Sequence, residues 1–252
     1  MSIQLDTVSY WLAFGAIGMS LGSLAILALT SRLRNEDRHH GYVALAITLV
    51  AATSYFAMWQ NVGNITVNGN TLQLARYIDW VITTPLLLFS LLAVGLPSIK
   101  SSKSAWTTGG LLVALIGLDI FMIVTGLIAS VVSTENSMPW YVFSCLALIV
   151  ITLLLFNTVY KLSQKLLKPS ASKLYINLTV FLTIIWVIYP IVWILGDTGT
   201  ATISTVSENM AYAILDLTAK VGFGLLLIAG LMDLSAKIKP KKDVSTIDAS
   251  AK

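Results

Sequence analysis

Long apolar runs alternate with short polar segments along this chain. Four stretches, residues 7–31, 80–99, 136–160 and 174–196, contain no Asp, Glu, Lys or Arg. Each is near or above the roughly 20 residues that an α-helix needs to cross a bilayer. The pattern has none of the short alternating strands of a membrane β-barrel. It therefore predicts a multi-pass helical membrane protein.

Seven apolar segments follow one another along the sequence. They lie at about residues 7–31, 38–61, 72–96, 104–131, 138–166, 172–196 and 206–236. The first segment is too long for a cleaved signal peptide and lacks a basic leader. We predict an all-α bundle of seven transmembrane helices over residues 1–238. Residues 239–252 form a basic tail that we expect to be disordered.

Turn residues between the second and third segments predict one departure from helix. Asn68-Gly69, within residues 64–71, is a strong signal for a two-residue hairpin turn. We expect a short external β-hairpin between the second and third helices.

Composition excludes several classes of protein. Of the 252 residues, 56% are hydrophobic and 11% are charged, whereas soluble domains carry roughly 25% charged residues. Cys145 is the single cysteine, so a disulfide scaffold is excluded, and we expect it to pack as a small apolar residue. The chain has no Gly-rich phosphate loop and no nucleophile elbow. His39 and His40 are expected in the first inner loop, outside the helices, and no metal site is predicted. These features argue against an enzyme.

The placement of the basic residues predicts the orientation. All but two of the sixteen Lys and Arg residues fall at or just beyond the ends of the first, third and fifth segments or in the tail. Loops rich in Lys and Arg stay in the cytoplasm. We therefore expect a cell-membrane protein with an extracellular N-terminus and a cytoplasmic C-terminus. The net charge of +4 then reports orientation, and no nucleic-acid partner is expected.

Two basic residues remain inside apolar segments, Arg76 in the third and Lys220 in the seventh. A charged residue at the bilayer centre costs at least about 2.5–3.5 kcal/mol and usually pairs with another charge. Asp216 lies four positions before Lys220, on the same helix face. Arg76, Asp79 and Thr83 form a similar row on the third helix. The predicted core therefore contains two rows of charge.

These rows allow two interpretations. They are either structural ion pairs or a reactive site. Burial disfavours the charged form of Lys220 and leaves its amine free to form a Schiff base with an aldehyde. Asp79 and Asp216 are then the candidate counterions. The residues alone leave both interpretations open.

An aromatic row accompanies the charges. Trp186, Tyr189 and Trp193 recur at spacings of three and four on the sixth segment, and Trp80 follows Asp79 on the third. Such a row is more often ordinary core than the wall of a cofactor pocket.

Three segments of the chain resemble the microbial (type 1) rhodopsins. Residues 76–88, RYIDWVITTPLLL, are similar to the third-helix signature of bacteriorhodopsin-like proteins. Residues 215–224, LDLTAKVGFG, resemble their retinal-attachment segment, and residues 186–193, WVIYPIVW, their sixth helix. The resemblance covers all seven segments in order.

The resemblance implies a role for each matching position. Lys220 carries all-trans-retinal as a protonated Schiff base, Asp79 is its counterion and proton acceptor, and Asp216 is the second counterion. Arg76 is the gate toward the outside, and leucine at position 87 is associated with green absorption. The positions implied to contact the chromophore or its counterion are Tyr55, Trp80, Thr84, Leu87, Met122, Gly126, Ser144, Trp186 and Tyr189.

The resemblance also implies a proton-release group near the outer surface. Glu208 matches one of two release glutamates. The other position holds Thr198, with Asp197 beside it as an alternative release group. Asp119 matches a buried acid near the retinal ring, where it acts as a structural hydrogen bonder.

The subtype is indicated by Asp79, Thr83 and Ser90 on the third helix. Asp79 disfavours the chloride and sodium pumps of the family, and Asp216 disfavours the inward pumps that carry proline there. Ser90 stands where efficient outward pumps have a carboxylic proton donor, and a serine hydroxyl is not a useful acid near neutral pH.

The resemblance therefore predicts a light-driven outward proton pump with slow cytoplasmic reprotonation. A photosensory rhodopsin that signals through a transducer stays open, as does an inward proton pump. The expected surroundings are a lipid bilayer and further copies of the chain, in a trimer or pentamer.

Overall fold

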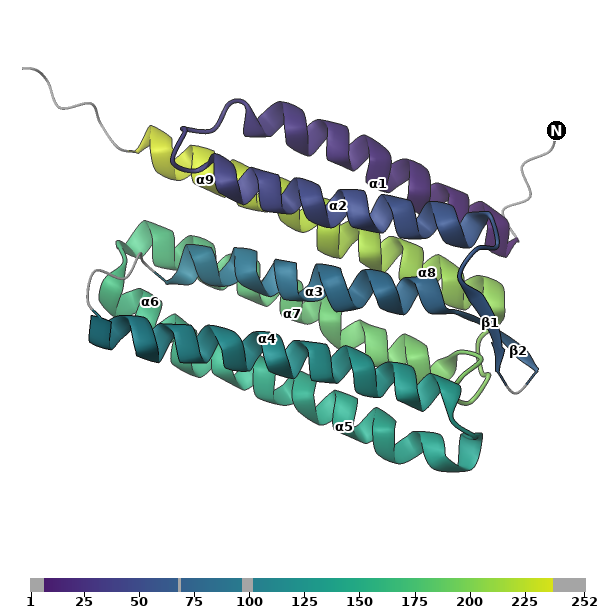
Figure 1. The fold of residues 1–252 in the computed structure, drawn as a ribbon. Helices are drawn as coiled ribbons and strands as arrows, with labels where there is room; N and C mark the ends of the chain where they lie inside the picture. Colours follow the sequence, from purple (N-terminus) through teal and green to yellow (C-terminus); the bar gives the residue numbers. More distant parts are fainter. Residues whose placement is uncertain (1–6, 68, 97–101, 238–252) are drawn as a thin grey trace, which may run out of the picture.

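A computed structural model describes residues 7–67, 69–96 and 102–237 and contains a bundle of membrane-length helices (Figure 1). Seven helical segments in these ranges are long and apolar enough to cross a bilayer. The single-helix crossings are α1 (Val8–Thr30), α2 (Arg38–Trp59), α3 (Leu74–Gly95), α4 (Ser102–Val131) and α7 (Pro169–Leu195). The fifth crossing joins α5 (Thr134–Leu153), η1 (Leu154–Val159) and α6 (Tyr160–Leu166), and the seventh joins α8 (Thr205–Leu217), η2 (Thr218–Gly222) and α9 (Phe223–Ala236). The predicted seven-helix fold is confirmed.

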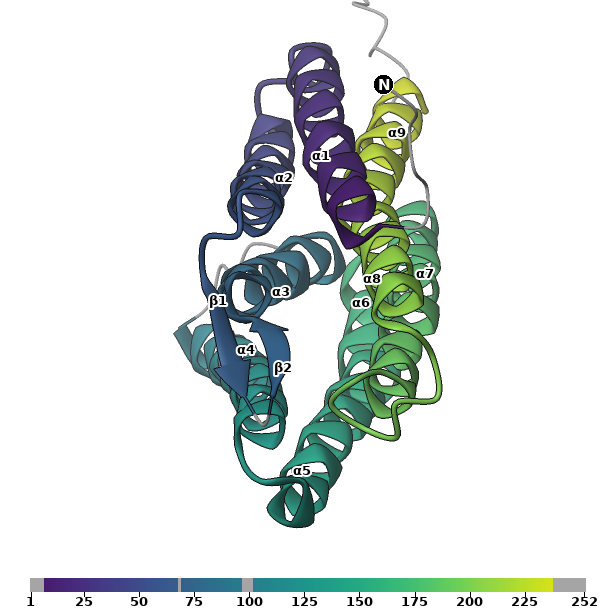
Figure 2. The same cartoon turned by 90° about the vertical axis from the view of Figure 1, so that its right-hand side faces the viewer.

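Helices that follow one another in the chain pack side by side. α2 lies against both α1 and α3, and α4 packs on α5. The seventh crossing returns beside α1 and also contacts α7 (Figure 2). Short links between antiparallel neighbours produce this arrangement. It brings α3 and the seventh crossing to the centre of the bundle, although they are far apart in the sequence.

The bundle carries apolar side chains on its surface and charges in its interior. Leu21, Val113 and Ile184 are each more than 60% exposed. Asp79, Asp216 and Lys220 are at most 2% exposed. This distribution suits a molecule whose solvent is lipid, because the apolar surface faces hydrocarbon while polar groups find partners inside.

The predicted hairpin is present between α2 and α3. Strand β1 (Asn64–Val67) pairs antiparallel with β2 (Asn70–Gln73), and Val67 lies opposite Asn70. Gly69 has φ of +84°, the left-handed conformation that a two-residue hairpin turn requires. We call this end of the bundle the hairpin end.

The opposite end, which we call the far end, carries the α1–α2 link at residues 31–37 and the last turn of α9 (Figure 1). Its described basic residues are Arg32, Arg34, Arg38, Lys161, Lys165, Lys168, Lys173 and Lys237. Lys100 and the predicted tail at residues 239–252 lie outside the described residues. These basic residues, which lie in the links or in the helix ends beside them, therefore gather at one end.

Two π-helical turns, η1 and η2, were not expected from the sequence. η2 contains Lys220. A π turn inserts one extra residue into a helix and is frequent at functional sites. Apolar periodicity gives no signal for one inserted residue, so sequence reasoning missed both turns.

The expected position of the histidines was wrong. His39 and His40 belong to the first turn of α2, which begins at Arg38 after the N-cap residue Asp37. His40 is only 6% exposed. The inward row of α2 starts at His40 and continues through Ala44, so the histidines belong to the second apolar segment, which was predicted from residue 38, and not to the loop before it.

Candidate functional site

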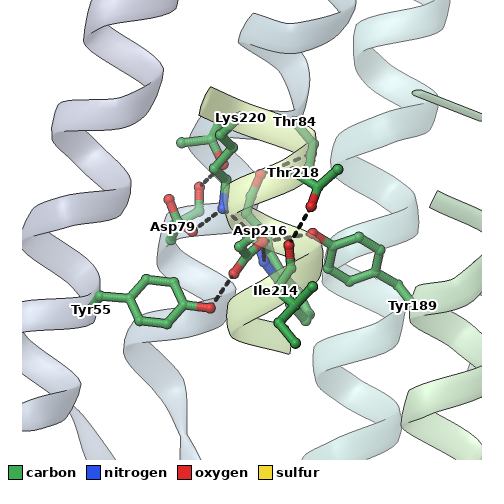
Figure 3. Close-up of polar contacts among 10 residues, drawn as sticks. Tyr55, Asp79, Thr84, Tyr189, Ile214, Asp216, Thr218 and Lys220 are labelled. Atoms are coloured by element: carbon green, nitrogen blue, oxygen red, sulfur yellow. Dashed lines mark hydrogen bonds and ion pairs between the residues drawn. The ribbon is translucent and has the colours of Figure 1, made fainter. Parts of the chain in front are cut away.

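An ion cluster joins the third and seventh crossings at the centre of the bundle (Figure 3). Lys220 Nζ lies 2.5 Å from Asp79 Oδ2 and 2.9 Å from Asp216 Oδ1. Two carboxylates and one ammonium leave one excess negative charge in a buried space, where unbalanced charge is costly. The sequence spacing placed Asp216 beside Lys220, and the fold adds Asp79 from α3.

Asp216 is surrounded by hydrogen-bond donors. The Tyr55 hydroxyl donates to Oδ2 at 2.7 Å. The Tyr189 hydroxyl and Trp80 Nε1 donate to Oδ1 at 2.7 Å and 3.1 Å. Hydrogen bonds to a carboxylate favour its charged form. Asp216 is therefore built as a fixed anion beside Lys220.

Asp79 has a different environment. Its Oδ2 contacts Lys220, but its buried Oδ1 has no hydrogen-bond partner among the described residues. Thr83 Oγ1 donates to the backbone carbonyl of Asp79, at 2.9 Å. Among the described residues, Asp79 therefore has fewer hydrogen-bond donors than Asp216.

A largely apolar cavity extends from Lys220 between the helices. Apart from Tyr55, every residue expected to contact a chromophore lies in its wall: Trp80, Thr84, Leu87, Met122, Gly126, Ser144, Trp186 and Tyr189. Half-buried Cys145 also lines it. Tyr55 instead reaches this region through Asp216.

The cavity fits an apolar molecule that ends in a carbonyl. Its polar groups include Lys220 and Asp216, whereas indole rings and aliphatic side chains form much of the remaining wall. A Cβ atom added at Gly126 would meet only Ser144 Oγ, at 3.4 Å. The glycine therefore leaves space beside the wall. A polyene aldehyde can be held here with its reactive end at the Lys220 amine.

Asp119 supports the cavity wall. Thr84 Oγ1 donates to Asp119 Oδ2 at 2.7 Å, and Asp119 is fully buried. On the same side, Ser144 Oγ donates to the Met122 carbonyl at 2.8 Å. These bonds fix α3 against α4 and α4 against α5.

Arg76 lies toward the hairpin end of the ion cluster. Its Nη2 donates to Asn209 Oδ1 at 2.7 Å, and its guanidinium carbon lies 4.6 Å from the Tyr212 ring centre. Within the described ranges, no carboxylate lies within ion-pair distance of Arg76. Sequence reasoning missed Asn209. The signal was available, because Asn209 precedes Tyr212 by three positions and Tyr212 precedes Asp216 by four.

A second cavity opens beyond Arg76. Its wall includes Arg76, Asp197, Thr198 and Glu208. Glu208 is 8% exposed, and its Oε2 accepts the backbone N–H of Asp197 at 3.1 Å. The Asp197 carboxylate accepts from Thr205 Oγ1 at 2.7 Å. The structure thus places both acids on one cavity, although their carboxylates do not hydrogen-bond to each other.

A polar cluster that the sequence did not suggest separates the two cavities. Tyr77 and Trp193 line the first cavity, and Ser130 lines the second. The Tyr77 hydroxyl lies 2.6 Å from Ser130 Oγ, and Trp193 Nε1 donates to Ser130 Oγ at 2.9 Å. Trp193, which the sequence indicated only as part of an aromatic row, thus also belongs to this polar cluster through its indole N–H group.

Ser90 lies on the opposite side of the ion cluster. It is 1% exposed, and its hydroxyl has no hydrogen-bond partner in the described part of the chain. The eleven positions between Asp79 and Ser90 correspond to roughly 16 Å along α3. The buried carboxylates of the described core are Asp79, Asp119, Glu208 and Asp216. No buried acid of this set takes the place of a donor at Ser90.

The fold and site define a seven-helix membrane protein with a buried lysine at one end of an aromatic cavity. The family model of bacteriorhodopsin-like proteins matches residues 6–234. Bacteriorhodopsin from Haloterrigena sp. (strain arg-4) is 36% identical over 90% of each chain. Archaerhodopsin-3 from Halorubrum sodomense is 32% identical over 94% of this chain and 92% of that one. The protein belongs to the bacteriorhodopsin-like family of microbial rhodopsins.

Solved structures agree with this assignment. The thermophilic rhodopsin from Rubrobacter xylanophilus superposes with a TM-score of 0.85 at 33% identity, covering 91% of this chain and 98% of that one. A cyanorhodopsin from Calothrix sp. NIES-2098 gives a TM-score of 0.81, also at 33% identity, covering 91% and 96%. Family membership implies a lysine-bound retinal chromophore in a multi-pass membrane protein. Members are light-driven transporters or photoreceptors and not enzymes.

Proposed function

We propose that this protein is a light-driven outward proton pump whose all-trans-retinal is bound to Lys220. The observation that carries the proposal is the 2.5 Å contact between Lys220 Nζ and Asp79 Oδ2. Of the two carboxylates beside Lys220, Asp79 has fewer hydrogen-bond donors among the described residues. Two further acids, Glu208 and Asp197, line a cavity toward the hairpin end.

The cavity residues hold and orient the chromophore. Trp80 and Trp186 are buried aromatic groups in its wall, and Gly126 leaves space beside Ser144. When bound, retinal supplies light absorption and an isomerisation that changes the position and proton affinity of the lysine nitrogen. The protein supplies the attachment point and the charges around it.

The proton then moves toward the hairpin end. Lys220 Nζ gives its proton to Asp79 Oδ2, while Asp216 stays ionised because three neutral donors hold it. Arg76 lies between this cluster and the second cavity, where Glu208 and Asp197 form the release group. Neutralising Asp79 weakens the attraction between the central acids and Arg76, which favours release of a proton near Glu208.

The direction follows from the proposed orientation. Basic residues of the links and helix ends gather at the far end, and the bias of Lys and Arg toward the cytoplasmic side supports a cytoplasmic far end. The hairpin and the N-terminus are then extracellular. A proton that leaves past Arg76 and Glu208 leaves the cell. Assembly into a trimer or pentamer stays a prediction.

A photosensory receptor is the second candidate function. Ser90 favours it, because a core without a carboxylic proton donor at this position returns slowly to its dark state and prolongs any light-activated conformation. A receptor of this kind would signal through a transducer protein in the same membrane. Net proton transport separates the two candidates.

Two matched substitutions test the proposed proton acceptor. Asp79→Asn removes the carboxylate at Lys220, and Asp119→Asn changes a buried carboxylate beside the cavity wall that does not contact Lys220. Cells that express each variant with retinal are illuminated while the external pH is recorded. We expect acidification with the native chain and with Asp119→Asn, and none with Asp79→Asn. Normal acidification by Asp79→Asn would contradict the proposal.

A further inference from the structure

His40 is a buried titratable side chain that the proton path above does not use. It is 6% exposed, and its Nδ1 atom has no hydrogen-bond partner among the residues described. The neighbouring His39 is exposed, and its Nδ1 lies 2.8 Å from the Glu36 carbonyl. The two adjacent histidines therefore differ: His39 faces solvent, whereas His40 is buried with an unpaired ring nitrogen in the described part of the chain.

His40 lies on the inward face of α2. Buried residues of this helix recur at His40, Ala44, Ile47, Ala51 and Tyr55, with the spacing of one helix face. The same face thus carries His40 near the far end and, at the ion cluster, the hydroxyl that bonds Asp216. Fifteen residues correspond to roughly 22 Å along the helix.

His40 and Ser90 both lie between the ion cluster and the far end, at different depths. Ser90 lies roughly 16 Å from the ion cluster along α3, so His40 lies about 6 Å further toward the far end. Both side chains are buried, and each has a polar atom without a partner in the described ranges. Ordered water is the usual partner of such atoms in a core.

The charged groups near His40 lie on its solvent side. The His39 ring centre is 4.1 Å from the His40 ring centre. Asp37 accepts from Arg34 Nε at 3.0 Å and from Ser235 Oγ at 3.5 Å, which ties the start of α2 to α9.

The interior side of His40 lacks such groups. From position 80 to position 96, the segment of α3 that leads to the far end has no charged residue. On α9, Asp233 pairs with the exposed Lys237. His40 is thus the buried group between solvent-reachable charges and an apolar interior.

We propose that His40 is the proton relay of the far half, passing a proton through water to Lys220 Nζ and regaining one from solvent beside Asp37. The inference rests on the proposed function and extends it to the second half of the cycle. The proton leaves a ring nitrogen of the imidazolium and is carried by water past Ser90. An imidazole ring can take up and release a proton, whereas the Ser90 hydroxyl is not a useful acid near neutral pH.

The test compares His40→Gln with His39→Gln, two equal changes at adjacent positions. The rate of recovery of the dark visible absorbance after a flash is measured from pH 5 to pH 9, with and without azide as a mobile proton donor. We expect His40→Gln to slow recovery about tenfold or more near neutral pH, because a positioned proton donor contributes at least this factor. Azide should restore the rate. His39→Gln should stay within about twofold of the native rate.

Equal recovery rates in the two variants would overturn the inference, and so would a slow His40→Gln recovery that azide leaves unchanged. A second measurement covers a His40→Gln chain that fails to fold. In the native protein with ¹⁵N-labelled histidine, the ring signals of a relay must titrate with the pH of the solvent. Signals from only one titrating histidine between pH 3 and pH 9 would refute the relay.

Failure of the relay and failure of the pump are distinguishable. Absorbance recovery is measured in detergent and does not depend on net transport. A native chain that moves no protons across a membrane, but whose recovery depends on His40, would refute the pump and keep the relay. A native chain that acidifies the medium with a recovery independent of His40 would do the reverse.

Discussion

Replacing Tyr55 with phenylalanine removes one hydroxyl from the ion cluster while keeping the ring. Tyr55 is fully buried, and its hydroxyl is the hydrogen-bond donor to Asp216 Oδ2 at 2.7 Å. Trp80, Tyr189 and Lys220 all bond the other oxygen, Oδ1. Tyr55→Phe therefore leaves Oδ2 of a buried carboxylate without its side-chain donor.

The expected cost follows from the charge on the acceptor. A hydrogen bond to a charged group contributes about 1.5–3 kcal/mol. We expect Tyr55→Phe to lower the free energy of unfolding by this amount. Tyr189→Phe should cost less, because Oδ1 keeps two other donors, Trp80 and Lys220. The assay is loss of visible absorbance of the retinal-bound protein as a denaturing detergent is added to micelles.

Tyr42→Phe is the matched control, because Tyr42 is 54% exposed on the same helix. A surface change of this kind should stay within about 0.5 kcal/mol of the native chain. If Tyr55→Phe were no more destabilising than Tyr42→Phe, Asp216 would not depend on this donor, and our description of a saturated anion would be refuted.

Three further predictions concern the proton path. Lys220→Ala should abolish visible absorbance on addition of retinal, because the attachment atom is lost; colour that survives extensive washing would refute the attachment. Ser90→Asp should make the recovery of dark absorbance at pH 8–9 at least about tenfold faster, as should azide with the native chain, because both supply a proton at a pH where a relay filled from solvent is slow; a recovery insensitive to both would refute a missing carboxylic donor. Asn209→Leu removes the acceptor of Arg76 and should delay proton release, followed with a pH-sensitive dye, whereas Asn157→Leu at an exposed amide should not; equal release times would contradict a positioning role for Asn209.

Much of the fold could be predicted because lipid imposes simple rules on sequence. The apolar segments marked all seven crossings, and Asn68-Gly69 marked the hairpin. What failed was local detail. The π turn at Lys220 inserts one residue without changing hydrophobicity. His39 and His40 were assigned to a loop because they are polar, although the second apolar segment, which starts at residue 38, contains them.

The candidate site was predictable to the extent that it lies on single helices. Asp216 and Lys220 share a helix face, so spacing alone placed them together. The pairing of Asp79 with Lys220 joins two helices. The sequence made Asp79 a candidate counterion, but spacing within one helix could not show that the two side chains meet. Asn209 was missed although its spacing places it on the face of Tyr212 and Asp216. Ser130 was missed because a serine near a helix end carries no signal until the fold supplies its partners, Tyr77 and Trp193.

The sign of the light-induced pH change tests the central claim most directly. Cells that express the native chain with retinal are illuminated in weakly buffered medium, with Lys220→Ala as the dark control and a protonophore added at the end. The account predicts external acidification that requires Lys220 and that the protonophore abolishes. External alkalinisation, or no change in a protein that otherwise binds retinal and responds to light, would contradict it.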